Sequence, residues 1–208
     1  ALQAQINPHF LYNTLDSIIW MSEAGENDQV VLMTSALAKL LRQSISNDRE
    51  QITVAEEIDY VRSYLTIQKM RYKDKLEYTI DVEERILDVR IIKFVLQPLV
   101  ENAIYHGLKY KETKGNLDIR GYRRGNRVCL VVADDGAGME ESELEHILEK
   151  KEKKTKSNGV GVYNVQKRLQ LYYGPEYGIS YISRKGEGTV ATVTIPLDGG
   201  KSNEETGR

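Results

Sequence analysis

The spacing of apolar residues changes about a third of the way along this 208-residue chain. Up to about residue 70, apolar side chains recur every three or four residues, which predicts amphipathic helices at 2–23, 29–46 and about 53–70. Beyond that point, strand-like runs are interspersed with two further helical patterns. The expected strands are 76–82, 116–123, 127–134, 178–184 and 189–196, and the expected helices are 91–109 and 161–173. This order predicts an α+β fold in which a mixed sheet carries its helices on one face.

The first two helices are separated only by the turn 25–28, so they should form an antiparallel helical hairpin. A lone hairpin cannot bury both apolar stripes, and we therefore expect two copies of the chain to form a homodimer with a four-helix bundle. The stripe residues are Leu2, Ile6, Phe10, Leu11, Leu15, Ile18 and Ile19 in the first helix and Val30, Met33, Leu37, Leu40, Leu41 and Ile45 in the second.

A polar joint at 47–50 separates this hairpin from the rest of the chain. Thr53 and Glu56 have the spacing of a capping box and predict the start of the next helix. We therefore expect a hairpin domain at 1–48 and a second domain at 49–198. The tail 199–208 contains no apolar residue and is expected to be disordered.

Composition narrows the function classes. The net charge of -2 and the pI of about 6.0 give no global basic field for nucleic acid. The single cysteine, Cys129, allows no disulfide within the chain and reads as a small core residue of a buried strand. No apolar run approaches the roughly 20 residues of a bilayer-spanning helix. The chain begins inside a helical pattern, so we expect it to be part of a longer protein.

The helical pattern at 91–109 carries polar residues beside its apolar face. Asn102, His106 and Lys109 follow at i, i+4 and i+7, which would place them on one stripe of an α-helix. A carboxamide oxygen is a hard neutral ligand for Mg²⁺, and a histidine and a lysine beside it suit phosphate. A solvated helix face is the plainer interpretation of the same pattern.

Two glycine motifs follow. Asp134 ends a strand pattern and precedes Gly136 and Gly138, so a carboxylate that can accept a hydrogen bond from the adenine amine lies beside backbone that can approach a ligand closely. Gly159 and Gly161 open the helix at 161–173, where free backbone N–H groups could bind phosphate. A dinucleotide-binding motif is disfavoured there, because its last glycine is replaced and no acidic residue follows about 20 positions later.

Asn102, Asp134-x-Gly136-x-Gly138 and Gly159-x-Gly161, in this order and at these distances, resemble the N, G1 and G2 boxes of the Bergerat (GHKL) ATP-binding fold. The segment 97–103 (QPLVENA) also resembles the family sequence. With residues 7–13 (NPHFLYN) upstream, the chain from 1 to 197 is similar to the dimerisation and catalytic core of LytS/YesM-type sensor histidine kinases. The resemblance implies an α/β sandwich of the Bergerat type at 49–198, with ATP and Mg²⁺ as cofactors.

The resemblance also implies residue roles. His9 would accept the γ-phosphoryl group, and Asn102 would bind Mg²⁺ through ATP. Asp134 would recognise adenine with Thr189 nearby, and 139–158 would be a mobile lid over the nucleotide. The glycines that would shape the pocket and the lid hinges are Gly136, Gly138, Gly159 and Gly161. His106 and Lys109 are the candidate phosphate contacts, because Tyr105 stands where the family often has lysine.

Two further residues are candidates near His9. Glu101, beside Asn102, could partner the imidazole when the two domains close. Asn13 lies one helical turn beyond His9. An amide at this offset is associated with dephosphorylation of a response regulator in histidine kinases, although Asn13 could equally only cap or space the bundle. The expected partners are a second copy and a response regulator receiver domain, and the expected location is the cytoplasmic portion of a bacterial membrane protein anchored upstream of residue 1.

Two alternatives keep the fold and change the function. The chain could be a GHKL ATPase that hydrolyses ATP to drive conformational change, but such enzymes place a general-base glutamate four residues before the magnesium asparagine. Here that position is Pro98, which cannot take up a proton. The chain could also be an inactive nucleotide-binding dimerisation module, which only a test for phosphate on His9 would exclude.

Overall fold

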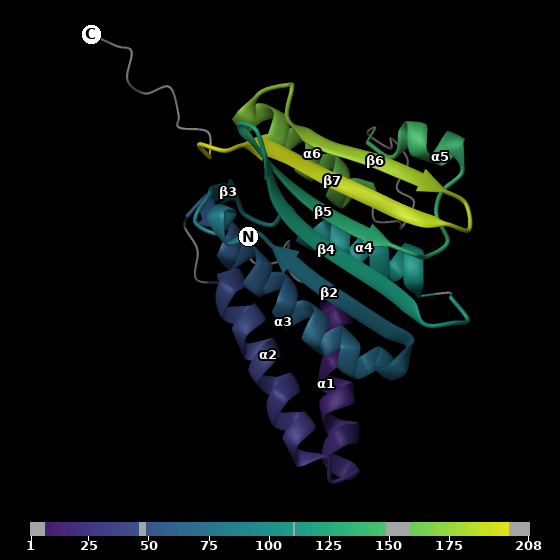
Figure 1. Cartoon of the computed structure of the whole chain (residues 1–208). Helices are drawn as coiled ribbons and strands as arrows, with labels where there is room; N and C mark the ends of the chain where they lie inside the picture. Colours follow the sequence, from purple (N-terminus) through teal and green to yellow (C-terminus); the bar gives the residue numbers. More distant parts are fainter. Residues whose placement is uncertain (1–6, 46–48, 110, 149–158, 200–208) are drawn as a thin grey trace.

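The computed structural model describes residues 7–45, 49–109, 111–148 and 159–199, which form a helical stem joined to an α/β domain (Figure 1). Its helices are α1 (Pro8–Glu23), α2 (Asn27–Ile45), α3 (Val54–Tyr72), α4 (Gln97–Asn102), α5 (Glu141–His146) and α6 (Gly159–Tyr173), with 3-10 turns at Lys73–Lys75 and Glu84–Ile86 and a π-helical turn, η4, at Ala103–Leu108. Its strands are β1 (Gln51–Thr53), β2 (Leu76–Val82), β3 (Arg90–Ile92), β4 (Gly115–Arg124), β5 (Arg127–Asp134), β6 (Gly178–Arg184) and β7 (Gly188–Pro196).

The expected hairpin is confirmed. Helices α1 and α2 run antiparallel and form the stem that extends away from the sheet (Figure 1). The side chain of Asn7 caps α1 by accepting a hydrogen bond from the backbone N–H of His9 at 3.0 Å. The stem packs on α3, where the rings of Phe10 and Tyr64 lie 5.0 Å apart. This contact fixes the part of α1 that carries His9 against the rest of the molecule.

Helix α3 begins with the predicted capping box. The Thr53 hydroxyl accepts a hydrogen bond from the Glu56 backbone N–H at 3.1 Å, and the Glu56 carboxylate accepts one from the Thr53 N–H at 2.8 Å. An ion pair of 2.6 Å between Lys39 and Asp59 links α2 to α3 on the surface. Helix α3 therefore connects the stem to the α/β domain along much of its length.

The main sheet has five strands in the order β2-β4-β5-β7-β6. Strands β2 and β4 are parallel and the other neighbouring pairs are antiparallel, so the sheet is mixed as predicted. Helices α4 and α6 lie on one of its faces (Figure 1). Along β5, the core side of the sheet is made by Val128, Leu130 and Val132, which are almost fully buried. The candidate site lies between this face and the helices.

The prediction that a helix begins at residue 91 is wrong. Residues 90–92 form β3, which pairs with β1 in a separate antiparallel ladder, and α4 begins only at Gln97. Proline at 98 suits the first turn of a helix and disfavours helical backbone before it. A buried carboxylate then fixes the start of α4, since Glu57 accepts backbone hydrogen bonds from Phe94 at 2.9 Å and Leu96 at 2.8 Å.

Two expectations concern residues outside the described ranges. The predicted disorder of the tail applies to residues of which only Gly199 is described, and positions 149–158 of the predicted lid are likewise outside them. The described part of the lid contains α5, a short helix that the sequence did not predict. Within the described residues, no helix combines the length and the apolar character that a membrane-spanning segment needs.

Candidate nucleotide and phosphoacceptor sites

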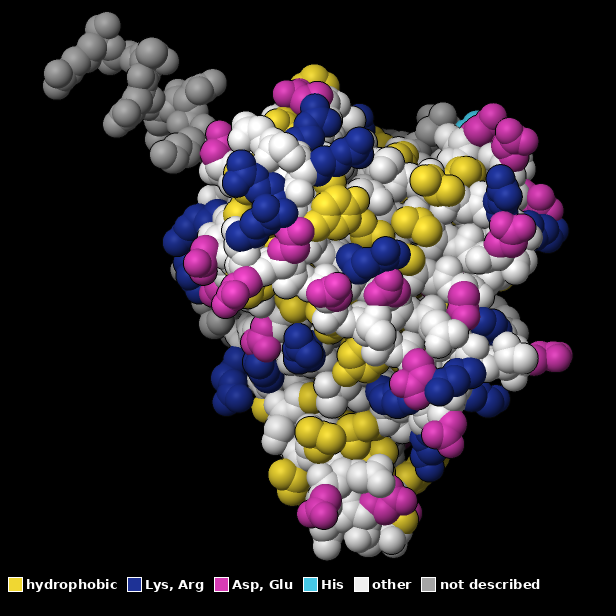
Figure 2. All heavy atoms as spheres, in the orientation of Figure 1, with side chains coloured by type: hydrophobic (Ala, Val, Ile, Leu, Met, Phe, Trp, Pro, Cys, Tyr) yellow, Lys and Arg dark blue, Asp and Glu magenta, His cyan; other side chains and the backbone are white. Residues whose placement is uncertain are grey.

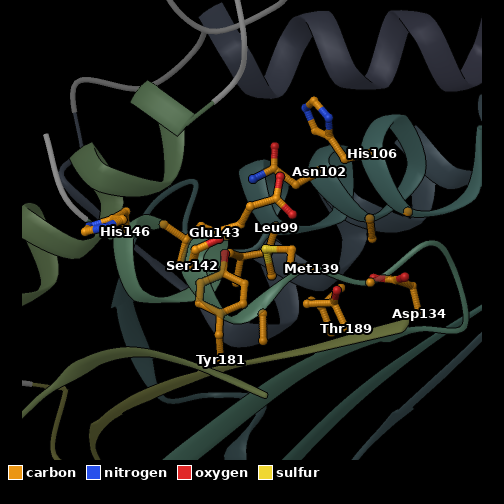
Figure 3. Close-up of a pocket in the computed structure, with 16 residues that line it drawn as sticks. Leu99, Asn102, His106, Asp134, Met139, Ser142, Glu143, His146, Tyr181 and Thr189 are labelled. Atoms are coloured by element: carbon orange, nitrogen blue, oxygen red, sulfur yellow. The ribbon is translucent and has the colours of Figure 1, made fainter. Parts of the chain in front are cut away.

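A cavity of about 540 Å³ lies between the core face of the sheet, the α4–η4 segment and α5 (Figure 3). Val132, Ala191 and Tyr181 contribute to it from three neighbouring strands, with Asp134 and Thr189 at the strand ends. The other lining residues are Leu99, Asn102, Ala103, His106, Gly107, Gly138, Met139, Ser142, Glu143, His146 and Ile147. The cavity has an apolar floor and polar groups on several sides, which is the usual composition of a small-molecule binding site.

Asp134 is the most perturbed carboxylate of the cavity. It is the last residue of β5, directly opposite Thr189 of β7, and its Oδ1 accepts a hydrogen bond from the Gly136 N–H at 2.9 Å. Burial raises the pKa of Asp134 to about 6, although the backbone N–H groups of Gly136 and Thr189 oppose this shift. A partly desolvated carboxylate in a cavity is well suited to accept a hydrogen bond from a ligand.

The neighbouring carboxylate, Asp135, is already engaged on the protein surface. Its side chain accepts hydrogen bonds from the backbone and side chain of Asn116 at 2.8 and 2.6 Å, and it forms an ion pair of 2.7 Å with Lys111. Asp135 does not line the cavity. Of these two acidic residues, only Asp134 is placed to meet a ligand there.

Close backbone approaches explain two glycines of the first motif and identify a third. A Cβ at Gly136 would collide with the backbone of Gly107, whose carbonyl accepts a hydrogen bond from the Ala137 N–H at 3.0 Å. A Cβ at Gly107 would lie 2.5 Å from Oδ1 of Asp134. Gly138 has a positive φ of 64° and would collide with the carbonyl of Arg184 if it carried a side chain. Gly107 was not identified from the sequence, because it belongs to neither of the two glycine motifs.

The α4–η4 segment presents only part of the predicted polar stripe. Asn102 and His106 line the cavity, but Lys109 does not. The expected stripe assumed α-helical spacing, whereas the backbone N–H of Lys109 bonds to the carbonyl of Ile104, five residues earlier, at 2.8 Å. This π-helical turn displaces the residues after it, and the Lys109 ammonium lies 6.0 Å from the centre of the Tyr105 ring.

The second glycine motif lies at the beginning of α6. Gly159 is the first residue of that helix, and a Cβ at Gly161 would lie at an ordinary contact distance of 3.7 Å from Pro98 Cβ. The packing of α6 against α4 therefore does not require glycine at position 161, and Gly161 does not line the cavity. Gly136 likewise does not line the cavity.

The structure adds lining residues that the sequence did not identify. Ser142, Glu143 and His146 come from α5 in the predicted lid, and Tyr181 comes from β6 (Figure 3). A strand alternates its side chains between two faces, so the buried Ile179 places Tyr181 on the core face two residues later. That periodicity could have identified Tyr181 once the ligand-binding face of the sheet was known.

His9 does not line the cavity and lies exposed near the start of α1. The amide nitrogen of Asn13 lies 3.0 Å from Nδ1 of His9 and 3.4 Å from its Nε2. An imidazole on a helix surface with one amide partner can meet a reactant from solvent or from another domain. The structure therefore places the exposed imidazole of His9 apart from the cavity.

Glu101 lies on the side of α4 that faces α3. Its carboxylate accepts a hydrogen bond from the Gln97 side chain at 2.8 Å, and burial raises its pKa. Burial, and after it the negative charge of Glu101, raise the pKa of Tyr64, the residue whose ring contacts Phe10 beside His9. Glu101 thus lies near the part of α3 that contacts α1. In the described arrangement its carboxylate accepts a hydrogen bond from Gln97 and not from His9.

Two family models match two different parts of the chain, one containing His9 and the other containing the cavity. Residues 1–76 match the family described as histidine kinase, and residues 87–199 match the histidine kinase-, DNA gyrase B- and HSP90-like ATPases. The second match spans more than half of the chain and contains every lining residue of the cavity. The chain therefore belongs to the histidine kinase-, DNA gyrase B- and HSP90-like ATPase family.

The similar proteins within this family are sensor histidine kinases. The sensor histidine kinase YesM of Bacillus subtilis is 39% identical over 196 residues, covering 94% of this chain and 33% of YesM. The sensor protein LytS of Oceanobacillus iheyensis is 34% identical over 200 residues, covering 94% of this chain and 34% of LytS. The chain thus spans about a third of the length of these sensor histidine kinases.

A similar fold occurs in the histidine kinase ThkA, solved in complex with the response regulator protein TrrA. The match has a TM-score of 0.51 at 16% identity and covers 83% of this chain and 52% of that one. At this identity the likeness shows the fold alone. It agrees with the expected helical hairpin followed by a Bergerat-type α/β sandwich.

Proposed function

We propose that this chain is the kinase core of a two-component sensor, which transfers the γ-phosphoryl group of ATP to His9 and then to an aspartate of a response regulator. The observation that carries the proposal is the pairing of two sites in one chain. An exposed imidazole is held by Asn13 on the stem, and a cavity with Asp134 and Asn102 lies in the α/β domain. Neither site alone would support transfer.

Within the cavity, we assign the adenine to the end formed by Asp134 and Thr189. The partly buried Asp134 carboxylate accepts a hydrogen bond from the exocyclic amine, and Gly107 and Gly136 let the backbone come close to that carboxylate. The phosphates then extend towards Asn102 and His106 on the opposite wall (Figure 3). The beginning of α6 at Gly159 offers further backbone N–H groups.

The residues of this wall fit Mg²⁺ carried by the nucleotide. The carboxamide of Asn102 supplies one hard, neutral oxygen, and Mg²⁺ commonly takes one or two protein ligands beside phosphate oxygens and water. When bound with the nucleotide, such an ion neutralises charge on the phosphates. Lys109 does not line the cavity, and it remains a candidate phosphate contact only if its side chain turns towards the bound nucleotide.

The chemistry at His9 needs no strong base. The lone pair of Nε2 forms a bond to the γ-phosphorus while the bond to the β,γ-bridging oxygen breaks, and that electron pair leaves on ADP. The ring proton remains on Nδ1 during the transfer and is afterwards released to solvent. A neutral imidazole is the prevalent form of an ordinary histidine near neutral pH, so the protein mainly has to bring the two sites together.

Pro98 distinguishes transfer from hydrolysis. It lies in the first turn of α4, four residues before Asn102, and has no group that could activate a water molecule. Glu101 is nearby but faces α3 and Gln97. The absence of a base at position 98 therefore favours a phosphotransferase over an ATPase of the same fold.

The response regulator would dock on the exposed stem around His9. The complex of ThkA with TrrA is an example of such an assembly in a protein of similar fold. Asn13 would meet the same docked receiver domain as His9, because it lies one turn further along α1. Its carboxamide could align a water molecule against the aspartyl phosphate, which would give the kinase phosphatase activity.

A homodimer is supported by apolar side chains that the stem leaves exposed. Figure 2 shows hydrophobic side chains gathered along the lower part of the stem. The exposed members of α1 and α2 are Tyr12, Leu15, Ile19, Trp20, Val31 and Leu32. We propose that two stems bury these residues in a four-helix bundle, with 1–48 as the dimerisation and phosphoacceptor domain and 49–198 as the catalytic domain. In the full-length protein this core would lie in the cytoplasm, joined to a membrane anchor.

Two measurements test the proposal. Incubation with Mg-ATP labelled in the γ-phosphate should give a protein label that is stable in alkali and lost in acid, and that moves to an added receiver domain. Sedimentation should show a dimer for the wild type and a monomer for the double variant Ile19→Glu, Val31→Glu. A label that survives acid but not alkali, or a monomeric wild type, would contradict the corresponding part.

A further inference from the structure

Tyr181 combines two properties that together identify it as a functional residue. It lines the cavity from β6, and its hydroxyl oxygen is buried without a hydrogen-bond partner among the residues that the structure describes. In Figure 3 its ring rises from the strand into the cavity, with the hydroxyl at the end remote from the backbone. Neither the ATP-binding motifs nor the proposed mechanism assigns this residue a role.

A buried hydroxyl without a partner is unfavourable, because folding removes its hydrogen bonds to water without replacing them. Phenylalanine would fill the same space without this cost. Burial also raises the pKa of the Tyr181 phenol, so the group remains a neutral O–H donor at physiological pH. A donor of this kind becomes favourable once a ligand in the cavity supplies an acceptor.

The position of Tyr181 indicates which part of a nucleotide it would meet. On the core face of the sheet, Asp134 pairs with Thr189, Thr189 pairs with Ser183, and Tyr181 lies two residues further along β6. Two strand spacings and two residues separate the Cα atoms of Asp134 and Tyr181 by roughly 12 Å. Figure 3 shows these two residues at opposite sides of Thr189. A purine on Asp134 would therefore point its substituent at N9 along the floor towards Tyr181.

We propose that the Tyr181 hydroxyl donates a hydrogen bond to a ribose or phosphate oxygen of the bound nucleotide. Asp134 would then accept a hydrogen bond from the adenine, and Tyr181 would donate one to the ribose or phosphate. The cavity would therefore contact the nucleotide at two separate positions. This inference rests on the proposed binding of ATP in the cavity and adds a residue to it.

The test uses the whole chain with Tyr181→Phe, which removes only the hydroxyl. Calorimetry with Mg-ATP should show a two- to tenfold rise in Kd, the usual worth of one neutral hydrogen bond. An equal rise for adenosine would assign the acceptor to the ribose, and a rise for ATP and ADP alone would assign it to the phosphates. The melting temperature of the nucleotide-free variant should stay the same or increase, because an unfavourable buried group has been removed.

Tyr105→Phe is the matched control. It also removes a buried hydroxyl that has no hydrogen-bond partner among the described residues, but Tyr105 does not line the cavity. Its Kd for Mg-ATP should equal that of the wild type. An unchanged Kd for Mg-ATP in Tyr181→Phe would overturn the inference, whatever the melting temperature of the variant. The proposed binding of ATP in the cavity would then still stand. A wild-type protein that binds no ATP would instead contradict the proposed function itself.

Discussion

The side-chain amide of Asn13 lies 3.0 Å from Nδ1 of His9, across one turn of α1. Rotation of that amide by 180° decides what the imidazole nitrogen meets. With the amide nitrogen facing it, Nδ1 accepts a hydrogen bond and the ring proton is on Nε2. With the amide oxygen facing it, Nδ1 keeps the proton and the lone pair of Nε2 is available for phosphoryl transfer. In the described arrangement the amide nitrogen faces Nδ1, so the nucleophilic tautomer of His9 requires the Asn13 amide to rotate.

Replacement of Asn13 by alanine should affect both directions of the reaction. If the rotated amide holds the nucleophilic tautomer during transfer, loss of that hydrogen bond predicts about a two- to tenfold slower labelling of His9. The phosphorylated regulator should live longer in the presence of this variant. Asp16→Ala is the control, since Asp16 is seven residues from His9, about 10 Å along the helix. If wild type shortens the regulator lifetime and Asn13→Ala shortens it equally, Asn13 has no phosphatase role.

Asp134 predicts opposite effects of pH on stability and on binding. Its pKa is raised to about 6 from the ordinary value of 3.8. Its contribution to the free energy of unfolding is therefore fully present below pH 3.8 and is lost as the pH rises through 6. Nucleotide affinity should instead increase over the same range, because the carboxylate is a better acceptor than the carboxylic acid. Adenosine is the appropriate ligand, since it carries no phosphate that titrates there.

The variant Asp134→Asn should remove both dependences on pH. It should also weaken ATP binding by about ten- to hundredfold, since a charge-assisted hydrogen bond of roughly 1.5–3 kcal/mol is lost, and it should reduce discrimination against GTP. Asp135→Asn is the matched control, because that carboxylate is engaged by Asn116 and Lys111 outside the cavity. Calorimetry in which Asp135→Asn weakens adenosine binding more than Asp134→Asn would contradict the assignment of the adenine site.

Glu57 should be essential for the position of α4. Its buried carboxylate accepts backbone hydrogen bonds from Phe94 and Leu96, ahead of the helix that carries Asn102. In Glu57→Ala these buried N–H groups lose their acceptor, which should lower the free energy of unfolding by about 2–5 kcal/mol in urea. The exposed Glu112, replaced by alanine, should change it by less than about 0.5 kcal/mol. Equal effects of the two variants would show that Glu57 does not hold α4.

The sequence predicted the elements whose signals are local. The capping box of Thr53 and Glu56, the hairpin of the first two helices and the strand that ends at Asp134 follow from periodicity and turn chemistry. The predicted beginning of α4 was wrong, because Ile91 and Ile92 suit a helix and a strand equally well. Pairing with β1 and the hydrogen bonds from Glu57, both distant in sequence, decide between them.

The candidate site shows the same limit. Asp134, Asn102 and His106 were predicted to share a site, and they line one cavity. Gly107 and Tyr181 were missed because their importance depends on contacts across the fold rather than on a motif. Lys109 was misplaced because a single π-helical turn changes the direction of every residue after it, and the sequence of η4 carries no clear signal for that turn.

The central claim is that His9, which lies outside the cavity, receives the phosphoryl group from ATP bound inside it. The chain has three histidines, His9, His106 and His146, and the other two line the cavity. Mapping of the acid-labile label by mass spectrometry under alkaline conditions is therefore the most direct measurement. The account predicts phosphate on His9 alone, no label in His9→Gln, and nearly unchanged ATP affinity in that variant. Phosphate on His106 or His146, or labelling of His9→Gln at the wild-type rate, would contradict it.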